Sequence, residues 1–248
     1  MSTLGTLKEL WRYPVKSMAG ENLTSGYVTY AGLAGDRVYG FVDREKHEKG
    51  DNFPWFTIRE LPRMLLYKAR FVEAPSIDRH YPDATQFTVQ VTTPDGATGD
   101  LHNAEFVSEL RRQFGNDFLL RFSEKGMHDA RPLAILGQST VAGLAAEVGT
   151  ELNRLRFRAN FYVDWNDDAP FYEDGLVGKR LKIGDRCEVF IQKKDPRCKI
   201  ITVDPTDASV DPKVLQTVAK NHKGCMGVYG VVIREGAVNA GDTISVVE

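Results

Sequence analysis

Short segments of strand-like sequence follow one another along most of this chain, and turn residues separate them at close intervals. In the stretch 87–92, apolar and polar residues alternate, which is the period of a half-buried strand. A Pro-Asp-Gly turn follows directly at 94–96. This spacing leaves room for few helices and favours a β-rich fold.

Two similar turns punctuate the C-terminal third. Gly184-Asp185 precedes a strand expected at 189–191, and Gly241-Asp242 precedes another at 243–247. We expect both to be hairpin turns of a small barrel. In the N-terminal half, strands are expected at 27–30 and 38–42, with a polar turn at 43–45 and exposed loops at 47–54 and 73–84.

Three segments have helix-capping signals. The residues expected at the helix N-caps are Asn103, Ser139 and Asp211, the last directly before Pro212. Glycines at 115 and 149 are expected to end the first two helices, and the third should run through Lys220. The sequence therefore predicts an α+β protein with a β-barrel-like N-terminal domain, 1–118, and a C-terminal β-barrel domain with a few helices, 119–248.

Composition limits the classes of function. The chain has 248 residues, of which 42% are hydrophobic and 27% charged, with a formal net charge of −2. No overall basic field favours nucleic acid or an anionic membrane, so an anion site must be built locally. No apolar run approaches the roughly 20 residues of a membrane span, and we expect no membrane association and a cytoplasmic location.

The three cysteines, an odd number without a Cys-x-x-Cys pair, disfavour a disulfide framework, a zinc knuckle and a four-cysteine cluster. Cys198 stands out because Arg197 and Lys199 flank it. A positive local field favours the thiolate, the form required of a nucleophile or of a ligand for a soft metal. The alternative is a buried strand cysteine beside solvated charges.

Other segments carry groups that suit an anion. Lys16 and Ser17 follow a proline-fixed turn, and a glycine turn precedes Arg37, so an ammonium, a hydroxyl and a guanidinium could bind a phosphate. If the stretch 156–160 is extended, Arg156, Arg158 and Asn160 share one side, which is costly to bury without an anionic partner. Solvent-exposed strand ends and turn ion pairs are the alternatives.

Five motifs taken together resemble one family. The segments YPVKS (13–17), GDR (35–37), TIRELPRM (57–64), RFRAN (156–160) and RCKIITVDP (197–205) occur in the order found in MOSC proteins that carry the N-terminal β-barrel domain. The pattern is similar to the branch of the mitochondrial amidoxime-reducing component, and the resemblance extends to the closing segments 227–232 and 241–246.

The resemblance implies a molybdenum cofactor, a pterin whose dithiolene holds the metal, bound between the two domains. Cys198 would be the protein ligand of molybdenum. The residues implied in cofactor binding are Lys16, Ser17, Arg37, Thr57, Arg59, Arg158, Asn160, Arg197 and Cys198. We also expect Asp204 to supply a proton, although an Asp before Pro205 can equally be a turn former.

The implied reaction is the reduction of a small N-oxygenated compound, such as an N-hydroxylated amidine. Electrons should come from a separate haem or iron–sulfur carrier with its reductase, because the chain lacks a Gly-x-Gly-x-x-Gly fingerprint and enough cysteines for a cluster. We expect neither the membrane anchor nor the iron–sulfur domain that some relatives carry. The alternatives are a persulfide carrier on Cys198 and a non-catalytic cofactor-binding protein.

One position departs from the family pattern. Ala130 and Arg131 occupy places where family members often present small hydroxyl residues. Either the Arg131 side chain makes a new contact to the cofactor, or the mouth of the substrate site differs.

Overall fold

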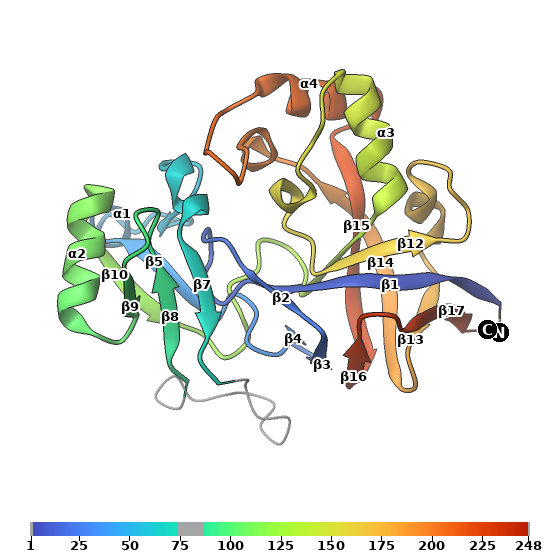
Figure 1. Cartoon of the computed structure of the whole chain (residues 1–248), viewed down its shortest axis with the longest axis horizontal. Coiled ribbons are helices and arrows are strands. Elements are labelled where there is room, and N and C mark those ends of the chain that lie inside the picture. The colour runs from blue at the N-terminus through green and yellow to red at the C-terminus, as the bar shows by residue number, and fades with distance from the viewer. Residues whose placement is uncertain (1, 74–86, 248) are drawn as a thin grey trace.

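The computed structural model describes residues 2–73 and 87–247 and shows two lobes side by side (Figure 1). The expected loop at 73–84 therefore lies, beyond its first residue, outside the described residues. The strands are β1 (Thr3–Arg12), β2 (Glu21–Leu23), β3 (Ser25–Thr29), β4 (Gly32–Leu33), β5 (Tyr39–Asp43), β6 (Trp55–Phe56), β7 (Lys68–Phe71), β8 (Val89–Thr92), β9 (Thr98–Asp100), β10 (Phe118–Phe122), β11 (Leu133–Gly137), β12 (Phe161–Trp165), β13 (Arg180–Ile183), β14 (Cys187–Pro196), β15 (Cys225–Arg234), β16 (Gly236–Asn239) and β17 (Thr243–Val247). The α-helices are α1 (Arg44–Glu48), α2 (Ala104–Phe114), α3 (Gln138–Val148) and α4 (Pro212–Asn221), and the 3₁₀ helices are η1 (Pro62–Leu66), η3 (Arg154–Phe157), η4 (Tyr172–Leu176) and η5 (Lys199–Thr202). The fold is β-rich α+β, as predicted.

The larger lobe is a barrel, called the barrel lobe below. Its sheet has the order β12-β11-β15-β14-β13-β17-β1-β2, and β12 pairs also with β1, so that seven strands close on themselves. Apolar side chains such as Leu7, Val163 and Ile191 fill the interior. The first strand of the chain is thus part of a barrel whose other strands all follow residue 119.

The smaller lobe, called the N-terminal lobe, is built around an aromatic core. Two three-stranded sheets, β10-β5-β6 and β7-β8-β9, surround it together with α2. Phe41 and Phe118 lie with ring centroids 4.3 Å apart, and Phe114 from α2 packs against both. Tilted and edge-to-face aromatic contacts of this kind stabilise a small core efficiently because each ring buries a large apolar area.

Two of the three predicted helix starts are confirmed. Asn103 accepts hydrogen bonds from the amides of residues 105 and 106 at the start of α2, and Gly115 ends that helix in the left-handed conformation. Asp211 caps α4 through the amide of residue 213, with Pro212 as the first helical residue. The predicted Ser139 cap is wrong, because α3 starts at Gln138 and its N-cap position, Gly137, offers no side chain. The carboxylate of Glu173 instead accepts from the Gly137 amide at 3.1 Å.

The two Gly-Asp turns differ. Gly184-Asp185 joins β13 to β14 as an antiparallel hairpin, as predicted. Gly241-Asp242 does not form a hairpin, because β16 pairs with β3 while β17 pairs with β1 and β13. The polar stretch 43–45 is also different from the prediction: Asp43 caps the short helix α1 by accepting from the amide of Lys46.

Two segments contact both lobes near the centre of the molecule. Residues 13–19 pass between them, with isolated parallel bridges from Val15 to Tyr39 and from Ala19 to Lys68. The segment after Cys198 is anchored on both sides, because Ile201 packs in the core beneath α3 and α4 while Val203 packs in the core of the N-terminal lobe. Side chains on these segments are therefore held at the boundary between the lobes. None of the helices in the described ranges is long and apolar enough to cross a bilayer.

Candidate functional site

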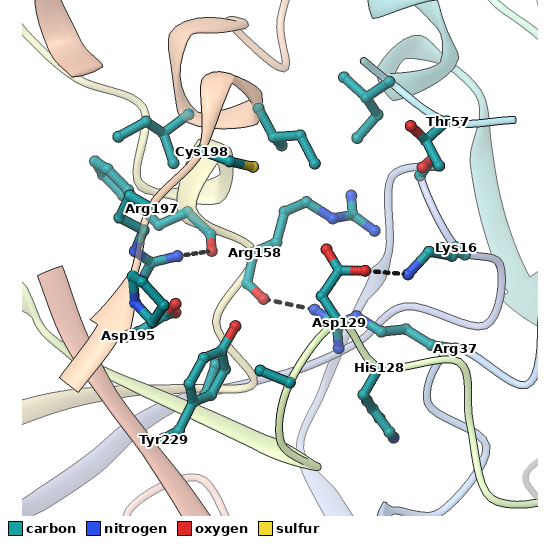
Figure 2. A pocket seen from close by; sticks show the side chains of 18 of the residues that line it. Lys16, Arg37, Thr57, His128, Asp129, Arg158, Asp195, Arg197, Cys198 and Tyr229 are labelled. Carbon is teal, nitrogen blue, oxygen red and sulfur yellow. Dashed lines mark hydrogen bonds and ion pairs between the residues drawn. The ribbon is translucent and has the colours of Figure 1, made fainter. Parts of the chain in front are cut away.

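A cavity of about 230 Å³ lies at this boundary, and residues from both lobes line it. Its lining consists of Lys16, Ser17, Arg37, Thr57, Ile58, Arg59, His128, Asp129, Ala130, Arg131, Ala134, Arg156, Phe157, Arg158, Asn160, Asp195, Pro196, Arg197, Cys198, Ile200, Ile201 and Tyr229. Figure 2 shows the Cys198 sulfur pointing into the same hollow as Lys16, Asp129 and Arg158. All the residues implied in cofactor binding by the motifs are in this lining; of the predicted residues only Asp204 is not.

Lys16 and Ser17 reach the cavity on the segment between the lobes. The amide of Lys16 donates to the Tyr39 carbonyl at 2.7 Å, and Ser17 adopts a left-handed φ of 73° that turns the chain at the cavity wall. The Lys16 ammonium donates to the carbonyl of Met127 at 2.7 Å and to Asp129 Oδ1 at 2.5 Å. Burial lowers the pKa of Lys16, and the carboxylate of Asp129 only partly opposes this.

Arg37 and Arg158 both lie against the Tyr13 ring. Their guanidinium carbons are 4.8 and 4.4 Å from the ring centroid. Arg37 also pairs with the buried carboxylate of Asp36, and its Nη2 donates to the Arg158 carbonyl at 2.8 Å. Cation–π contacts and hydrogen bonds thus hold two like charges side by side.

Both arginines have a left-handed backbone, with φ of 54° at each. Together with Ser17, three of the non-glycine residues with positive φ therefore lie in the cavity wall. Such conformations cost free energy for residues with a side chain and persist where the surrounding structure enforces them, which is typical of ligand sites.

The stretch 156–160 is not extended, which was the condition for its polar side chains to share one side. Residues 154–157 form the 3₁₀ helix η3, and Arg158 follows it in the left-handed region. Arg156, Arg158 and Asn160 are nevertheless all buried and all line the cavity, so a tight turn rather than a strand brings them together. Asn160 also fixes the barrel, since its Oδ1 accepts from the Ala134 amide at 3.2 Å and its Nδ2 donates to the Trp11 carbonyl at 3.2 Å.

Thr57 and Arg59 enter from the N-terminal lobe. The Thr57 hydroxyl donates to Glu60 at 2.8 Å and accepts from the Arg59 amide at 3.2 Å, which fixes the turn that presents Arg59. Arg59 Nη2 lies 3.2 Å from Asp129 Oδ2 and 3.6 Å from the sulfur of Cys198. A guanidinium from the other lobe therefore touches the thiol.

The positive field at Cys198 comes from a residue that sequence reasoning did not assign to it. The guanidinium of Arg197 is occupied elsewhere, donating to the carbonyls of Met226 and Phe157 at 2.8 and 2.9 Å. Lys199 does not line the cavity. Arg59, 139 positions away in the chain, supplies the contact.

The other two cysteines differ from Cys198. Cys187 lies inside the barrel core, where burial raises the pKa of its thiol to about 12. Cys225 begins β15 opposite Pro196 and does not line the cavity. Cys198 alone of the three presents its sulfur to the cavity.

Asp204, the expected proton source, does not reach the cavity. Its carboxylate accepts from Arg156 Nη2 at 2.6 Å and from the amide of Thr206 at 2.8 Å. It thus has the alternative role considered above, that of a turn former, and it holds Arg156 in place. The structure gives no support for a direct part in proton transfer.

Several lining residues were missed. Asp129 bridges Lys16 and Arg59, and although burial alone would raise its pKa, these two cations bring the pKa below its usual range. Burial lowers the pKa of His128 to about 4, so the imidazole is neutral near pH 7. Asp195 is fully buried, and burial raises its pKa although Arg197 lies 2.9 Å away. Of these three residues, only Asp129 could have been noticed in the sequence, because it begins the segment that departs from the family pattern.

The cavity has a marked excess of positive charge. Seven of its lining side chains are lysine or arginine, whereas two are carboxylates, among the residues that the structure describes. Three buried guanidinium nitrogens in its wall make no well-oriented hydrogen bond to the described residues: Nε of Arg156, Nη2 of Arg158 and Nη2 of Arg197, the last lying 2.9 Å from Asp195. Burial and the neighbouring Arg37 lower the pKa of Arg158 to about 10. A buried cation without a paired carboxylate, such as Arg158, is unfavourable, so the cavity is suited to an anionic occupant.

The protein side chains alone do not make a metal site. Within residues 2–73 and 87–247, no cluster of three or more His, Cys, Asp and Glu side chains could hold a metal ion. A metal bound at Cys198 would need further ligands from a non-protein group. An anionic cofactor that carries its own metal ligands fits this donor set, because the cations would bind its charge and the thiolate its metal.

Two family models match this chain. The family model of the MOSC N-terminal beta barrel domain matches residues 4–118, and the model of the MOSC domain matches residues 111–245. The chain belongs to the MOSC family. The crystal structure of the YuaD protein from Bacillus subtilis covers 98% of this MOSC chain with a TM-score of 0.50 at 15% sequence identity, which shows a shared fold.

Two groups of curated relatives are similar to this MOSC protein. Mitochondrial amidoxime reducing component 2 of Homo sapiens is 24% identical over 98% of the chain and 84% of the relative. The bovine protein of the same name, from Bos taurus, is 23% identical over the same shares. The molybdenum cofactor sulfurase of Caenorhabditis elegans is 29% identical over 46% of the chain, which is 16% of that relative.

Proposed function

We propose that this MOSC protein binds a molybdenum cofactor in the cavity between the lobes and reduces small N-oxygenated compounds there. The observation that carries the proposal is the cavity itself, where seven cationic side chains surround two carboxylates and the thiol of Cys198. The near full-length similarity to amidoxime reducing components supports the reaction class.

The cationic groups would hold the cofactor. Lys16, Ser17 and Arg37 line the cavity from the first 37 residues of the chain. Arg158 also lines it, and its Nη2 has no hydrogen-bond partner among the residues that the structure describes. Each charge-assisted hydrogen bond to a phosphate or pterin oxygen contributes about 1.5–3 kcal/mol. Because Tyr13 already holds Arg37 and Arg158 in place, the site is preorganised for an anion.

Cys198 would ligate the metal. Its half-buried sulfur contacts Arg59, and Asp129 orients Arg59 through the ion pair at 3.2 Å. The bound molybdenum cofactor supplies the two-electron reduction chemistry. The remaining roles belong to the chain: the cations bind the cofactor, and the lobes exclude bulk water from the cavity floor, where Ala134 and Asn160 are buried.

Two measurements on the purified holoprotein test the proposal. Elemental analysis should find stoichiometric molybdenum, and benzamidoxime should be reduced to benzamidine with reduced viologen as the electron donor. Protein from a host unable to make the cofactor serves as the control. Stoichiometric metal without turnover of any N-hydroxylated substrate would leave a non-catalytic cofactor-binding protein, and absence of the metal would remove the proposal.

A sulfur-carrying role is the second candidate, because the second half of the chain is similar to molybdenum cofactor sulfurases. In that case Cys198 would carry a persulfide, and its exposure to the cavity fits this use as well. Mass spectrometry distinguishes the two candidates. A persulfide on Cys198 in protein free of molybdenum favours sulfur transfer, whereas an unmodified Cys198 with bound metal favours the reductase.

A further inference from the structure

A second hollow adjoins the central cavity on the outer surface. It has a volume of about 290 Å³ and is lined by Tyr30, Ala31, Lys125, His128, Ala130, Arg131 and Pro132. His128, Ala130 and Arg131 line both hollows, so this outer cleft begins where the central cavity ends. Of its lining residues, Arg131 is the one that also counts among the seven cations of the central cavity.

The outer cleft is positively charged. Lys125 and Arg131 are its ionised side chains, and none of the described residues that line it is a carboxylate. His128 adds no charge near pH 7, because burial holds the pKa of its imidazole at about 4. The nearby Glu235 carboxylate accepts a hydrogen bond from the Tyr30 amide at 2.9 Å and lies outside the lining. An anionic group is therefore the complementary occupant.

Arg131 is positioned to bind such a group. Its Nε donates to Gln192 of β14, and its Nη1 donates to the Ala130 carbonyl at 2.8 Å. Its Nη2 donates to none of the residues that the structure describes. The guanidinium is thus fixed in direction while one nitrogen stays available, which lowers the entropy lost on binding a carboxylate.

Besides its charged side chains, the cleft has largely apolar lining residues, namely Tyr30, Ala31, Ala130 and Pro132. The Tyr30 ring is 60% exposed and offers a flat face. Gly32, two residues after Tyr30, has a left-handed φ of 107°, and a Cβ there would lie 2.6 Å from the Pro132 carbonyl oxygen. This close approach fixes the turn before β4, which carries Tyr30 and Ala31, against the segment that carries Arg131.

A short chain of contacts connects the cleft with the thiol. Arg59 touches the sulfur of Cys198 at 3.6 Å and pairs with Asp129, which lies two residues before Arg131. Because Ala130 and Arg131 line both hollows, a small molecule that extends past Ala130 from the cavity of Cys198 enters the outer cleft.

We propose that the outer cleft is a substrate subsite which selects N-oxygenated compounds carrying a carboxylate at the end remote from the N–O group. Arg131 and Lys125 bind the carboxylate, and the Tyr30 ring packs against the body of the substrate. This inference rests on the proposed reductase function and adds the class of substrate to it.

The test compares neutral benzamidoxime with 4-carboxybenzamidoxime on the holoprotein. With reduced viologen as donor, kcat/KM for the carboxylated compound should exceed that for benzamidoxime by about tenfold or more. Arg131→Gln and Lys125→Gln should each lower this ratio several-fold, and Arg131→Lys should retain most of it. Lys220→Gln, at an exposed lysine of α4 that lines neither hollow, is the matched control and should leave the ratio unchanged.

Binding to the oxidised holoprotein, which cannot turn over without a donor, gives an independent readout by calorimetry. In this measurement 4-carboxybenzamidoxime should bind more tightly than benzamidoxime, and Arg131→Gln should weaken the binding of the carboxylated compound about tenfold. Selective binding without turnover would support the subsite and overturn the reductase proposal. Turnover of both compounds with a ratio that Arg131→Gln and Lys125→Gln leave within twofold of the wild type would overturn the subsite alone.

Discussion

Replacing Arg158 by methionine tests whether the buried guanidinium serves a bound anion rather than the fold. In the structure, Arg158 is nine-tenths buried and donates one well-formed hydrogen bond, from Nη1 to the Met18 carbonyl at 2.7 Å. Burial, followed by the neighbouring charge of Arg37, lowers its pKa from 12.5 to about 10. At about 1.36 kcal/mol for each pKa unit, keeping the charged form in the anion-free protein costs roughly 3 kcal/mol.

The sign of this cost follows from the direction of the shift. Since the pKa of Arg158 is lower in the folded state, the cost is fully present below pH 10 and is relieved as the pH rises toward 12.5. Arg158→Met removes the cost at neutral pH but leaves the Met18 carbonyl without its donor, at about 1–3 kcal/mol. The anion-free variant should therefore lie between unchanged and roughly 2 kcal/mol more stable, a rise in Tm of up to about 4 °C for a chain of this size.

The bound state should respond in the opposite direction. The variant lacks a charge-assisted hydrogen bond of about 1.5–3 kcal/mol, so cofactor occupancy at limiting supply should fall tenfold or more. Thermal unfolding of cofactor-free protein and molybdenum content of holoprotein are the two assays, and Arg180→Met, a half-exposed arginine on β13, is the control. Lower stability of the anion-free variant by more than about 2 kcal/mol, with occupancy intact, would refute the reasoning and make Arg158 a structural residue.

Three further predictions follow from the site. Cys198→Ala should abolish reductase activity and Cys198→Ser should impair it severely, whereas Cys187→Ser and Cys225→Ser should stay within a few-fold of the wild type; equal loss in Cys225→Ser would mean that the ligand is misassigned. Asp129→Asn should destabilise the protein at pH 7 by leaving buried Lys16 unpaired, and because the pKa of Asp129 is lowered in the fold, the difference in urea unfolding from the wild type should shrink as the pH falls below 3.8. Purified alone, the protein should accept electrons from reduced viologen and not from NADH; a haem or iron–sulfur carrier with its reductase should restore NADH-driven turnover with salt-sensitive rates, and fast NADH oxidation by the pure chain would contradict this.

Local sequence patterns predicted the elements whose cause is local. The Asn103 cap and the Gly115 end of α2 depend on residues within one turn of the helix, and so does the Asp211-Pro212 start of α4. The Gly241-Asp242 turn resembles a hairpin in sequence, but its two strands pair in different sheets, a choice made by distant partners. The motifs likewise identified which residues gather at the cavity.

Contacts between distant segments could not be predicted. The charge at the Cys198 thiol was assigned to Arg197 and Lys199 because they are its neighbours in sequence, yet Arg59 from the other lobe makes the contact. Asp204 was expected at the cavity because it follows Cys198 closely, but Arg156 binds its carboxylate at 2.6 Å. In both cases the tertiary fold decides which charge meets which, and a single sequence does not contain that pairing.

The closure of the barrel by β1 makes the molecule discontinuous in sequence. Because β1 pairs with both β12 and β17, the first and last strands of the chain lie side by side (Figure 1), and the N-terminal lobe is in effect an insertion between the first strand of the barrel and the rest. During synthesis, β1 is made before the other barrel strands, and the barrel can close only after β17, the last of them, is available to pair with it. Non-local pairing of this kind slows folding. A fragment beginning after residue 119 would lack strand β1 and expose the unpaired edges of β12 and β17. A circular permutant that joins the termini by a short linker would keep every strand pairing intact.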